Sequence, residues 1–249
     1  MGLIQKKTLK KQFNSSMTFN KNIKVIAFDA DDTLWVNETY FREAEQKFAK
    51  LLSGYETANK IDQELFQVEI KNLETYGYGV KGFMLSMIEC ALDLSNHQIE
   101  PKTMQSILEI GKVMIHKPIE LLEGVEEVLS GLFSKYKLIV ATKGDLLDQE
   151  RKLEKSGLLK YFHHVEVMSE KKEKDFLKLI GHLDIRPEEF LMVGNSLKSD
   201  VLPVISIGGS AIHVPFHTTW AHEEVEEHQK KNKEYITLSN LTELLTYIS

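Results

Sequence analysis

The chain has 249 residues, 42% hydrophobic and 27% charged, a balance typical of a globular protein rather than a disordered or fibrous one. Its formal net charge of −6 offers no basic excess to a phosphate backbone, so nucleic acid is not an expected partner. No apolar run approaches the roughly 20 residues that cross a bilayer, so no membrane is expected either. The single cysteine, Cys90, predicts a reducing, cytoplasmic setting.

The N-terminal half of the chain contains one predicted strand and a long helical stretch. Residues 1–20 are basic and polar without the apolar segment of a secretory signal, so we expect an N-terminal tail outside the fold. The apolar, β-branched run at 23–28 predicts a buried strand. Over 37–117 apolar residues recur at helical spacing between polar and glycine breaks, which predicts four helices and no strand.

After Pro118, helix and strand patterns alternate to the end of the chain. The predicted strands cover 137–142, 164–168, 190–194, 211–214 and 235–238, and the predicted helices cover 124–135, 146–156, 173–183, 199–206 and a terminal segment. The charged run at 222–234 is interpreted as the solvated face of a helix. This alternation predicts an α/β fold, a Rossmann-like three-layer parallel sheet built from 21–36 and 118–249 and interrupted by the all-helical segment.

Polar side chains follow four of the predicted strands, where ligands bind in open α/β sheets. They are Asp29, Asp31, Thr33, Thr142, Lys143, Lys171, Asn195 and Asp200. Neighbouring carboxylates repel unless a cation lies between them, and Mg²⁺ takes oxygen ligands of this kind. A hydroxyl, turn amides and an ammonium suit a phosphate group. Together these groups indicate phosphoryl transfer through an aspartyl phosphate.

This set resembles the haloacid dehalogenase (HAD) superfamily of phosphohydrolases. The DxDxT motif of that superfamily is similar to Asp29-Ala30-Asp31-Asp32-Thr33, its strand-end hydroxyl to Thr142, and its lysine to Lys171. Its last acidic motif resembles VGNSLKSD at 193–200. The motifs come in the family's order over 23–214. Lys172 and Lys174 compete for the lysine role, and Lys171 is preferred because it follows the strand directly.

The resemblance implies a role for each matching residue. Asp29 would attack phosphorus, and Asp31 would serve as general acid and then general base. Thr142 and Lys171 would hold the phosphoryl oxygens, with Lys143 as a further phosphate-binding candidate. Mg²⁺ would be held by Asp29, the main-chain carbonyl of Asp31 and the last motif.

Asn195 departs from the pattern, because many relatives have Asp there. An amide oxygen is a weaker, neutral ligand for Mg²⁺. Asp200 would supply the missing charge either directly or through Asn195 or a water, and the sequence leaves both arrangements open.

The helical segment 37–117 falls where the family places a C1 cap, which implies a small phosphorylated metabolite as substrate. Tyr76–Lys81 is either a substrate-facing loop of that cap or an ordinary turn between helices. The expected activity is a Mg²⁺-dependent phosphatase.

Other functions remain as alternatives. One is a phosphomutase of the same family, which would not release phosphate in bulk. Another is a non-catalytic phosphate-binding or receiver-like signalling domain. A receiver is disfavoured because the candidate nucleophile ends the first strand and because such a domain has no place for the helical segment. A dehalogenase is disfavoured because it has no use for Asp31 as a proton donor.

Overall fold

The computed structural model describes residues 22–226 and 235–248, so the predicted tail at 1–20 lies outside the described residues. Six parallel strands form one sheet in the order β3-β2-β1-β4-β5-β6. They are β1 (Val25–Phe28), β2 (Lys137–Lys143), β3 (His164–Met168), β4 (Phe190–Gly194), β5 (Ser210–His213) and β6 (Ile236–Thr237). The predicted parallel sheet is thereby confirmed.

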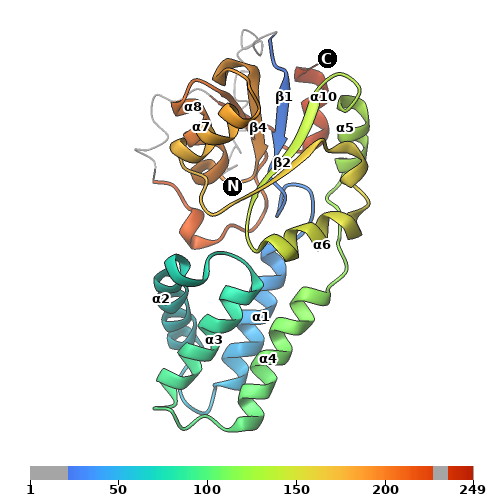
Figure 1. The fold of residues 1–249 in the computed structure, drawn as a ribbon. Coiled ribbons are helices and arrows are strands. Elements are labelled where there is room, and N and C mark those ends of the chain that lie inside the picture. The colour runs from blue at the N-terminus through green and yellow to red at the C-terminus, as the bar shows by residue number, and fades with distance from the viewer. Residues whose placement is uncertain (1–21, 227–234, 249) are drawn as a thin grey trace, which may run out of the picture.

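Helices cover both faces of this sheet (Figure 1). One face is covered by α5 (Val125–Leu132), α6 (Leu146–Ser156) and α10 (Leu244–Tyr247), and the other by α7 (Glu173–His182) and α8 (Leu202–Ser206). In β1, Ile26 and Phe28 pack on the first face, whereas Val25 and Ala27 pack on the second. Because side chains alternate along a strand, a short run that is apolar throughout is buried on both sides.

Four further α-helices of the described residues form a bundle beside the carboxyl ends of the strands (Figure 1). They are α1 (Glu38–Leu51), α2 (Ala58–Tyr76), α3 (Val80–Leu94) and α4 (Pro101–His116). The bundle has a hydrophobic core of its own, which includes Phe48, Leu65, Met87 and the buried Cys90. Among the described residues, no helix is both long and apolar enough to cross a membrane.

The helix predicted at 199–206 begins earlier than expected, as a wide π-helical turn at Leu197–Val201 that continues into α8. The Ser196 hydroxyl accepts a hydrogen bond from the Ser199 N–H at 3.0 Å and so caps this turn. The turn brings Asp200 back against Gly194, where a Cβ atom would overlap the aspartate side chain. Glycine at the end of β4 therefore makes room for a buried carboxylate at the sheet edge.

Candidate active site

The turn after β1 is held by Asp32, a residue for which the sequence analysis predicted no role. Its carboxylate accepts hydrogen bonds from the N–H groups of Asn37 at 2.8 Å and Glu38 at 2.9 Å, which caps the start of α1. Its φ of 62° lies in the left-handed region, which aspartate tolerates better than most residues. Burial raises the pKa of Asp32 to about 8. Asp32 thus fixes the turn between β1 and α1, and this turn keeps Asp29 and Asp31 at the end of the strand.

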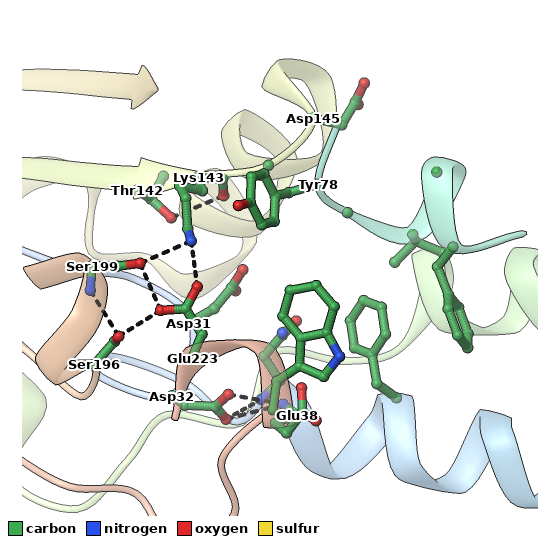
Figure 2. A pocket seen from close by; sticks show the side chains of 18 of the residues that line it. Asp31, Asp32, Glu38, Tyr78, Thr142, Lys143, Asp145, Ser196, Ser199 and Glu223 are labelled. Carbon is green, nitrogen blue, oxygen red and sulfur yellow. Dashed lines mark hydrogen bonds and ion pairs between the residues drawn. The ribbon is translucent and has the colours of Figure 1, made fainter. Parts of the chain in front are cut away.

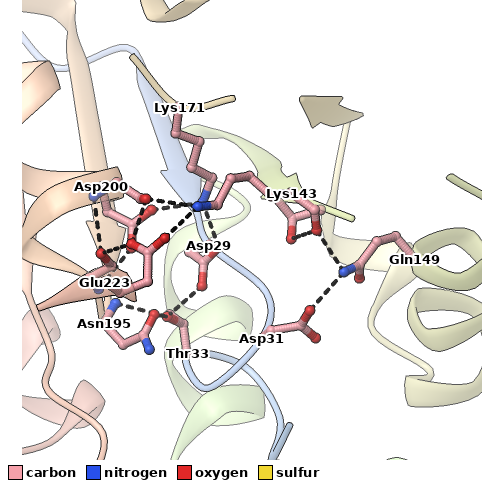
Figure 3. Close-up of polar contacts among 12 residues, drawn as sticks. Asp29, Asp31, Thr33, Lys143, Gln149, Lys171, Asn195, Asp200 and Glu223 are labelled. Atoms are coloured by element: carbon pink, nitrogen blue, oxygen red, sulfur yellow. Dashed lines mark hydrogen bonds and ion pairs between the residues drawn. The ribbon is translucent and has the colours of Figure 1, made fainter. Parts of the chain in front are cut away.

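Asp29, Lys171 and Asp200 come together in a buried group at the sheet edge (Figure 3). Lys171 Nζ lies 2.5 Å from Asp29 Oδ1 and 2.7 Å from Asp200 Oδ1. Burial disfavours the ammonium, but the two carboxylates outweigh it and raise the pKa of Lys171. Burial raises the pKa of Asp29 to about 7, against the attraction of Lys171. Of the three competing lysines, the structure places Lys171 in this group and leaves Lys172 and Lys174 exposed.

Thr33 joins the first motif to the last one. Its Oγ1 donates to Asp29 Oδ2 at 3.1 Å, lies 3.4 Å from Asn195 Oδ1, and accepts from the Asn195 N–H at 3.1 Å. Asp200 Oδ2 accepts from the Ser196 N–H at 2.9 Å, so both Asp200 oxygens are engaged by the protein. The predicted residues of the first, third and last motifs therefore meet in one place.

Asp31 is oriented by three donors, and its carboxylate points toward Gln149 (Figure 3). Oδ1 accepts from Trp35 Nε1 at 2.8 Å and from Lys152 Nζ at 2.9 Å, and Oδ2 accepts from Gln149 Nε2 at 2.8 Å. Burial opposes the charge of Lys152, but Asp31 and Asp148 raise its pKa. The sequence analysis missed Gln149 and Lys152, because α6 is polar on most sides and only the fold shows which side meets Asp31.

Thr142 and Lys143 lie at the end of β2. Thr142 is buried, and its hydroxyl donates to the Lys143 carbonyl at 3.2 Å. Lys143 Nζ donates to Ser199 Oγ at 2.9 Å and to Glu223 Oε1 at 2.6 Å (Figure 2). The two predicted phosphate-binding residues of β2 therefore reach the same edge as Lys171, with Lys143 held by an ion pair.

Glu223 is a site residue that the sequence analysis did not find. Its Oε2 accepts from Ser196 Oγ at 2.5 Å and from Ser199 Oγ at 2.6 Å. Burial opposes ionisation, but Lys143 and the two serines lower the pKa of Glu223 to about 2. The interpretation of 222–234 as a solvated helix face is wrong for its described part, because Ala221–Glu223 is a 3₁₀ turn tied into the site, and 224–226 is not helical. Residues 227–234 lie outside the described residues.

The bundle contributes Tyr78 from the connection between α2 and α3. Its ring lies 4.1 Å from Lys143 Nζ and meets Trp220 edge to face at 6.2 Å, and its hydroxyl donates to Glu170 Oε1 at 3.3 Å (Figure 2). Lys81, in the first turn of α3, forms an ion pair with Asp145 at 2.8 Å. The segment Tyr76–Lys81 is therefore in contact with the strand ends, although Tyr76 itself bonds to Glu89 within the bundle.

A cavity of about 170 Å³ lies between the sheet edge and the bundle. On the sheet side it is lined by Asp29, Asp31, Thr142, Lys143, Lys171, Asn195 and Asp200. On the bundle side it is lined by Glu38, Phe41, Glu45, Glu69, Tyr78 and Phe83. A cavity of roughly 150 Å³ is enough to hold benzene, so this space suits a phosphate with a small organic group.

A parallel sheet whose carboxyl edge gathers aspartates, a threonine and lysines around a cavity defines an α/β protein with a polar binding site at the strand ends. The chain belongs to the haloacid dehalogenase-like hydrolases, because the model of that family matches residues 23–208. No curated protein matches the chain significantly.

Solved structures agree with this family. A haloacid dehalogenase-like family hydrolase from Xanthomonas campestris is 38% identical, covers 91% of both chains and has a TM-score of 0.80. A HAD phosphatase from Thermococcus onnurineus is 22% identical over 91% of this chain and 98% of that one, with a TM-score of 0.63. A 2-haloacid dehalogenase from Pseudomonas syringae is 19% identical over 91% and 98%, with a TM-score of 0.59. The last two show the shared fold alone.

Proposed function

We propose that the chain is a Mg²⁺-dependent phosphatase that acts on a small phosphorylated metabolite through an aspartyl phosphate. The observation that carries this proposal is the pair of carboxylates after β1. Asp29 lies against the ammonium of Lys171, and Asp31, two residues on, is oriented separately by Gln149 and Lys152. One carboxylate beside the buried Lys171 ammonium and a second, two residues on, oriented by a separate set of donors suit a nucleophile and a proton carrier.

The reaction has two steps. In the first, an Asp29 oxygen attacks phosphorus, the bond from phosphorus to the leaving oxygen breaks, and Asp31 gives its proton to that oxygen. In the second, Asp31 takes a proton from water, the water oxygen attacks phosphorus, and the bond from phosphorus to Asp29 breaks. Inorganic phosphate leaves, and both aspartates return to their starting states.

Three side chains are suited to hold the phosphoryl oxygens. Lys171 keeps its positive charge beside two carboxylates, and Thr142 offers a hydroxyl from the neighbouring strand end. Lys143 offers a second ammonium, which Glu223 and Ser199 hold at the cavity wall. Fixed positive groups aimed at a transferring phosphoryl group stabilise the charge that develops on it.

The donor set at the site fits Mg²⁺. Asp29 Oδ2 and Asn195 Oδ1 both lie within 3.4 Å of the Thr33 hydroxyl, so two hard oxygen donors are close together. No group of three or more His, Cys, Asp or Glu in the described part of the chain forms a metal site by itself. Mg²⁺ typically binds one or two carboxylates and completes its shell with other oxygens, among them those of water.

Asp29, Asn195 and the Asp31 carbonyl would hold the ion. Asp200 would not contact the ion but would fix the Asn195–Ser196 turn, because its carboxylate accepts the Ser196 N–H. Mg²⁺ bound there supplies positive charge that favours the ionised form of Asp29 and offsets the charge of the phosphoryl oxygens.

The experiment is phosphate release from p-nitrophenyl phosphate by the native protein with Mg²⁺, with EDTA, and by Asp29→Asn. We expect release that needs Mg²⁺ and falls to background in Asp29→Asn, whereas Asp62→Asn, on an exposed position of α2, retains it. Release that survives in Asp29→Asn would contradict the nucleophile. Halide release from a 2-haloacid without phosphate release would make the chain a dehalogenase instead.

A further inference from the structure

The bundle side of the cavity holds three carboxylates that the reaction above does not use. Glu38 and Glu45 lie on one face of α1, seven residues apart, and Glu69 lies on α2. All three line the same cavity as Asp29. They lie on the wall where the organic part of a phosphoester would rest, because the phosphate-binding groups lie on the opposite, sheet side.

The Arg42 guanidinium forms ion pairs with two of these three carboxylates. Arg42 lies 2.9 Å from Glu38 Oε1 and 2.9 Å from Glu45 Oε2, so it is shared between the two acids of α1. Glu69 is only 9% exposed, and its Oε1 has no hydrogen-bond partner. Burial, with Glu45 and Glu38 adding to it, raises the pKa of Glu69 to about 8. A buried carboxyl group without a partner is costly, so this oxygen is suited to a ligand that brings a donor.

The walls beside these acids are aromatic. Phe41 on α1 and Phe83 on α3 line the cavity, with ring centroids 5.1 Å apart. The negative face of an aromatic ring attracts a cation, which adds to the attraction of the carboxylates. A hydroxyl on the ligand would satisfy Glu69 but would bring no positive charge to this group of acids, and an anionic ligand would add negative charge to it.

Resting on the proposed phosphatase function, we propose that the leaving group of the substrate carries an ammonium group, which binds against Glu69 between α1 and α2. The substrate class is then an aminoalkyl phosphomonoester, with the phosphate at Lys171 and the amine in the subsite of Glu38, Glu45 and Glu69. The ammonium would donate to Glu69 and stabilise its ionised form, so the proton that burial keeps on this carboxyl would be released when the amine binds.

Binding of phosphonates tests the subsite without turnover, because their C–P bond is not hydrolysed. We would titrate the full chain, with Mg²⁺, by calorimetry with 3-aminopropylphosphonate and with its isosteres butylphosphonate and 3-hydroxypropylphosphonate. The amine should bind at least about tenfold more tightly than the butyl compound, and the hydroxyl compound should lie between them.

The ratio of the amine affinity to the butyl affinity should fall to near one in Glu69→Gln. Glu64→Gln, at an exposed position on the same helix outside the cavity, should retain the native ratio. Any of four results would overturn the subsite. In the native protein these are equal affinities for the amine and butyl compounds, tightest binding of the hydroxyl compound, or no binding of any phosphonate. In Glu69→Gln it is an unchanged ratio of the amine affinity to the butyl affinity.

Different results would contradict the phosphatase proposal. If neither p-nitrophenyl phosphate nor an aminoalkyl phosphomonoester is hydrolysed but the amine still binds preferentially, the reaction assigned to Asp29 is wrong and the subsite stands. If hydrolysis follows the expected pattern but the amine has no advantage, the reaction stands and the substrate class is wrong.

Discussion

Lys152 shows how a single side chain controls the second carboxylate of the site. Its ammonium lies between Asp31 Oδ1 and Asn37 Oδ1, at 2.9 Å from each, so it fixes Asp31 relative to the start of α1. We expect Lys152→Met to lower kcat by about tenfold to a hundredfold with a small change in KM, since a misplaced proton carrier slows the chemical step.

Steady-state kinetics with p-nitrophenyl phosphate would measure this effect, and thermal unfolding would check that the variant is folded. Lys152→Arg keeps the charge and should retain much of the activity. Lys155→Met, at an exposed position one turn along α6, is the matched control. Native kcat in Lys152→Met would show that Asp31 does not depend on this contact.

Glu69 makes the stability of the chain depend on pH. Burial, with Glu45 and Glu38 adding to it and Arg42 opposing it, raises the pKa of Glu69 to about 8 in the folded chain, against 4.5 for an ordinary glutamate. Between these values the unfolded chain loses a proton that the folded chain keeps, so the contribution of Glu69 to the free energy of unfolding falls as pH rises. The loss begins near pH 4.5 and levels off above about pH 8.

Glu69→Gln removes this titration. The Tm of the variant, relative to the native protein, should therefore rise from pH 4.5 to pH 8.5 and should not change further at higher pH. For a chain of this size each kcal/mol corresponds to roughly 2–4 °C. Thermal unfolding at a series of pH values measures the difference, and Glu64→Gln should show none. A difference that stays constant with pH would mean that Glu69 is ionised in the folded chain.

At the scale of elements, Asp32 joins β1 to α1. It accepts the N–H groups of Asn37 and Glu38, which no residue inside the helix can accept. Asp32→Ala should lower the free energy of unfolding by about 0.5–2 kcal/mol, the usual cost of losing such a cap. Asp32→Asn keeps a carbonyl acceptor and tolerates the positive φ, so it should lose less. Thermal unfolding of both variants is the measurement, and equal losses would contradict the capping role.

Most helices and strands could be predicted from the sequence because polar or glycine-containing turns mark where they begin and end. The strands 164–168 and 190–194 agree to the residue with β3 and β4, since polar turns follow both. At the sheet edge, only Ile236 and Thr237 of the predicted 235–238 pair as β6. The motif residues that directly follow strands were predictable in the same way. Glu223 was not predictable, since a charged run has the same sequence pattern whether it faces solvent or a half-buried lysine such as Lys143.

For the whole molecule, the contact between the bundle and the sheet edge centres on Tyr78. This residue meets Lys143 of β2 and Trp220 of the segment after β5, and so joins three parts of the chain at the cavity. The position of the helical segment between two motifs was visible in the sequence. The sequence did not show whether Tyr76 or Tyr78 meets the sheet edge. That depends on the direction of the backbone at Gly77 and Gly79, both of which have positive φ.

Tyr78→Ala should loosen the closure of the bundle over the site. The ion pair of Lys81 with Asp145, also across this contact, is partly exposed and is worth roughly 0–1 kcal/mol, so it cannot replace the half-buried ring. Without the ring, water enters more readily and the substrate is held less firmly, so kcat should fall and KM should rise together. Tyr78→Phe loses only the hydrogen bond to Glu170, so its kcat and KM should be close to those of the native protein.

Steady-state kinetics with p-nitrophenyl phosphate measures both constants, and thermal unfolding confirms that each variant is folded. Tyr55→Ala is the matched control, since Tyr55 is an exposed tyrosine in the same helical segment and is not part of the cavity wall. If Tyr78→Ala behaved like Tyr55→Ala, the bundle would be held over the strand ends by contacts other than this aromatic one.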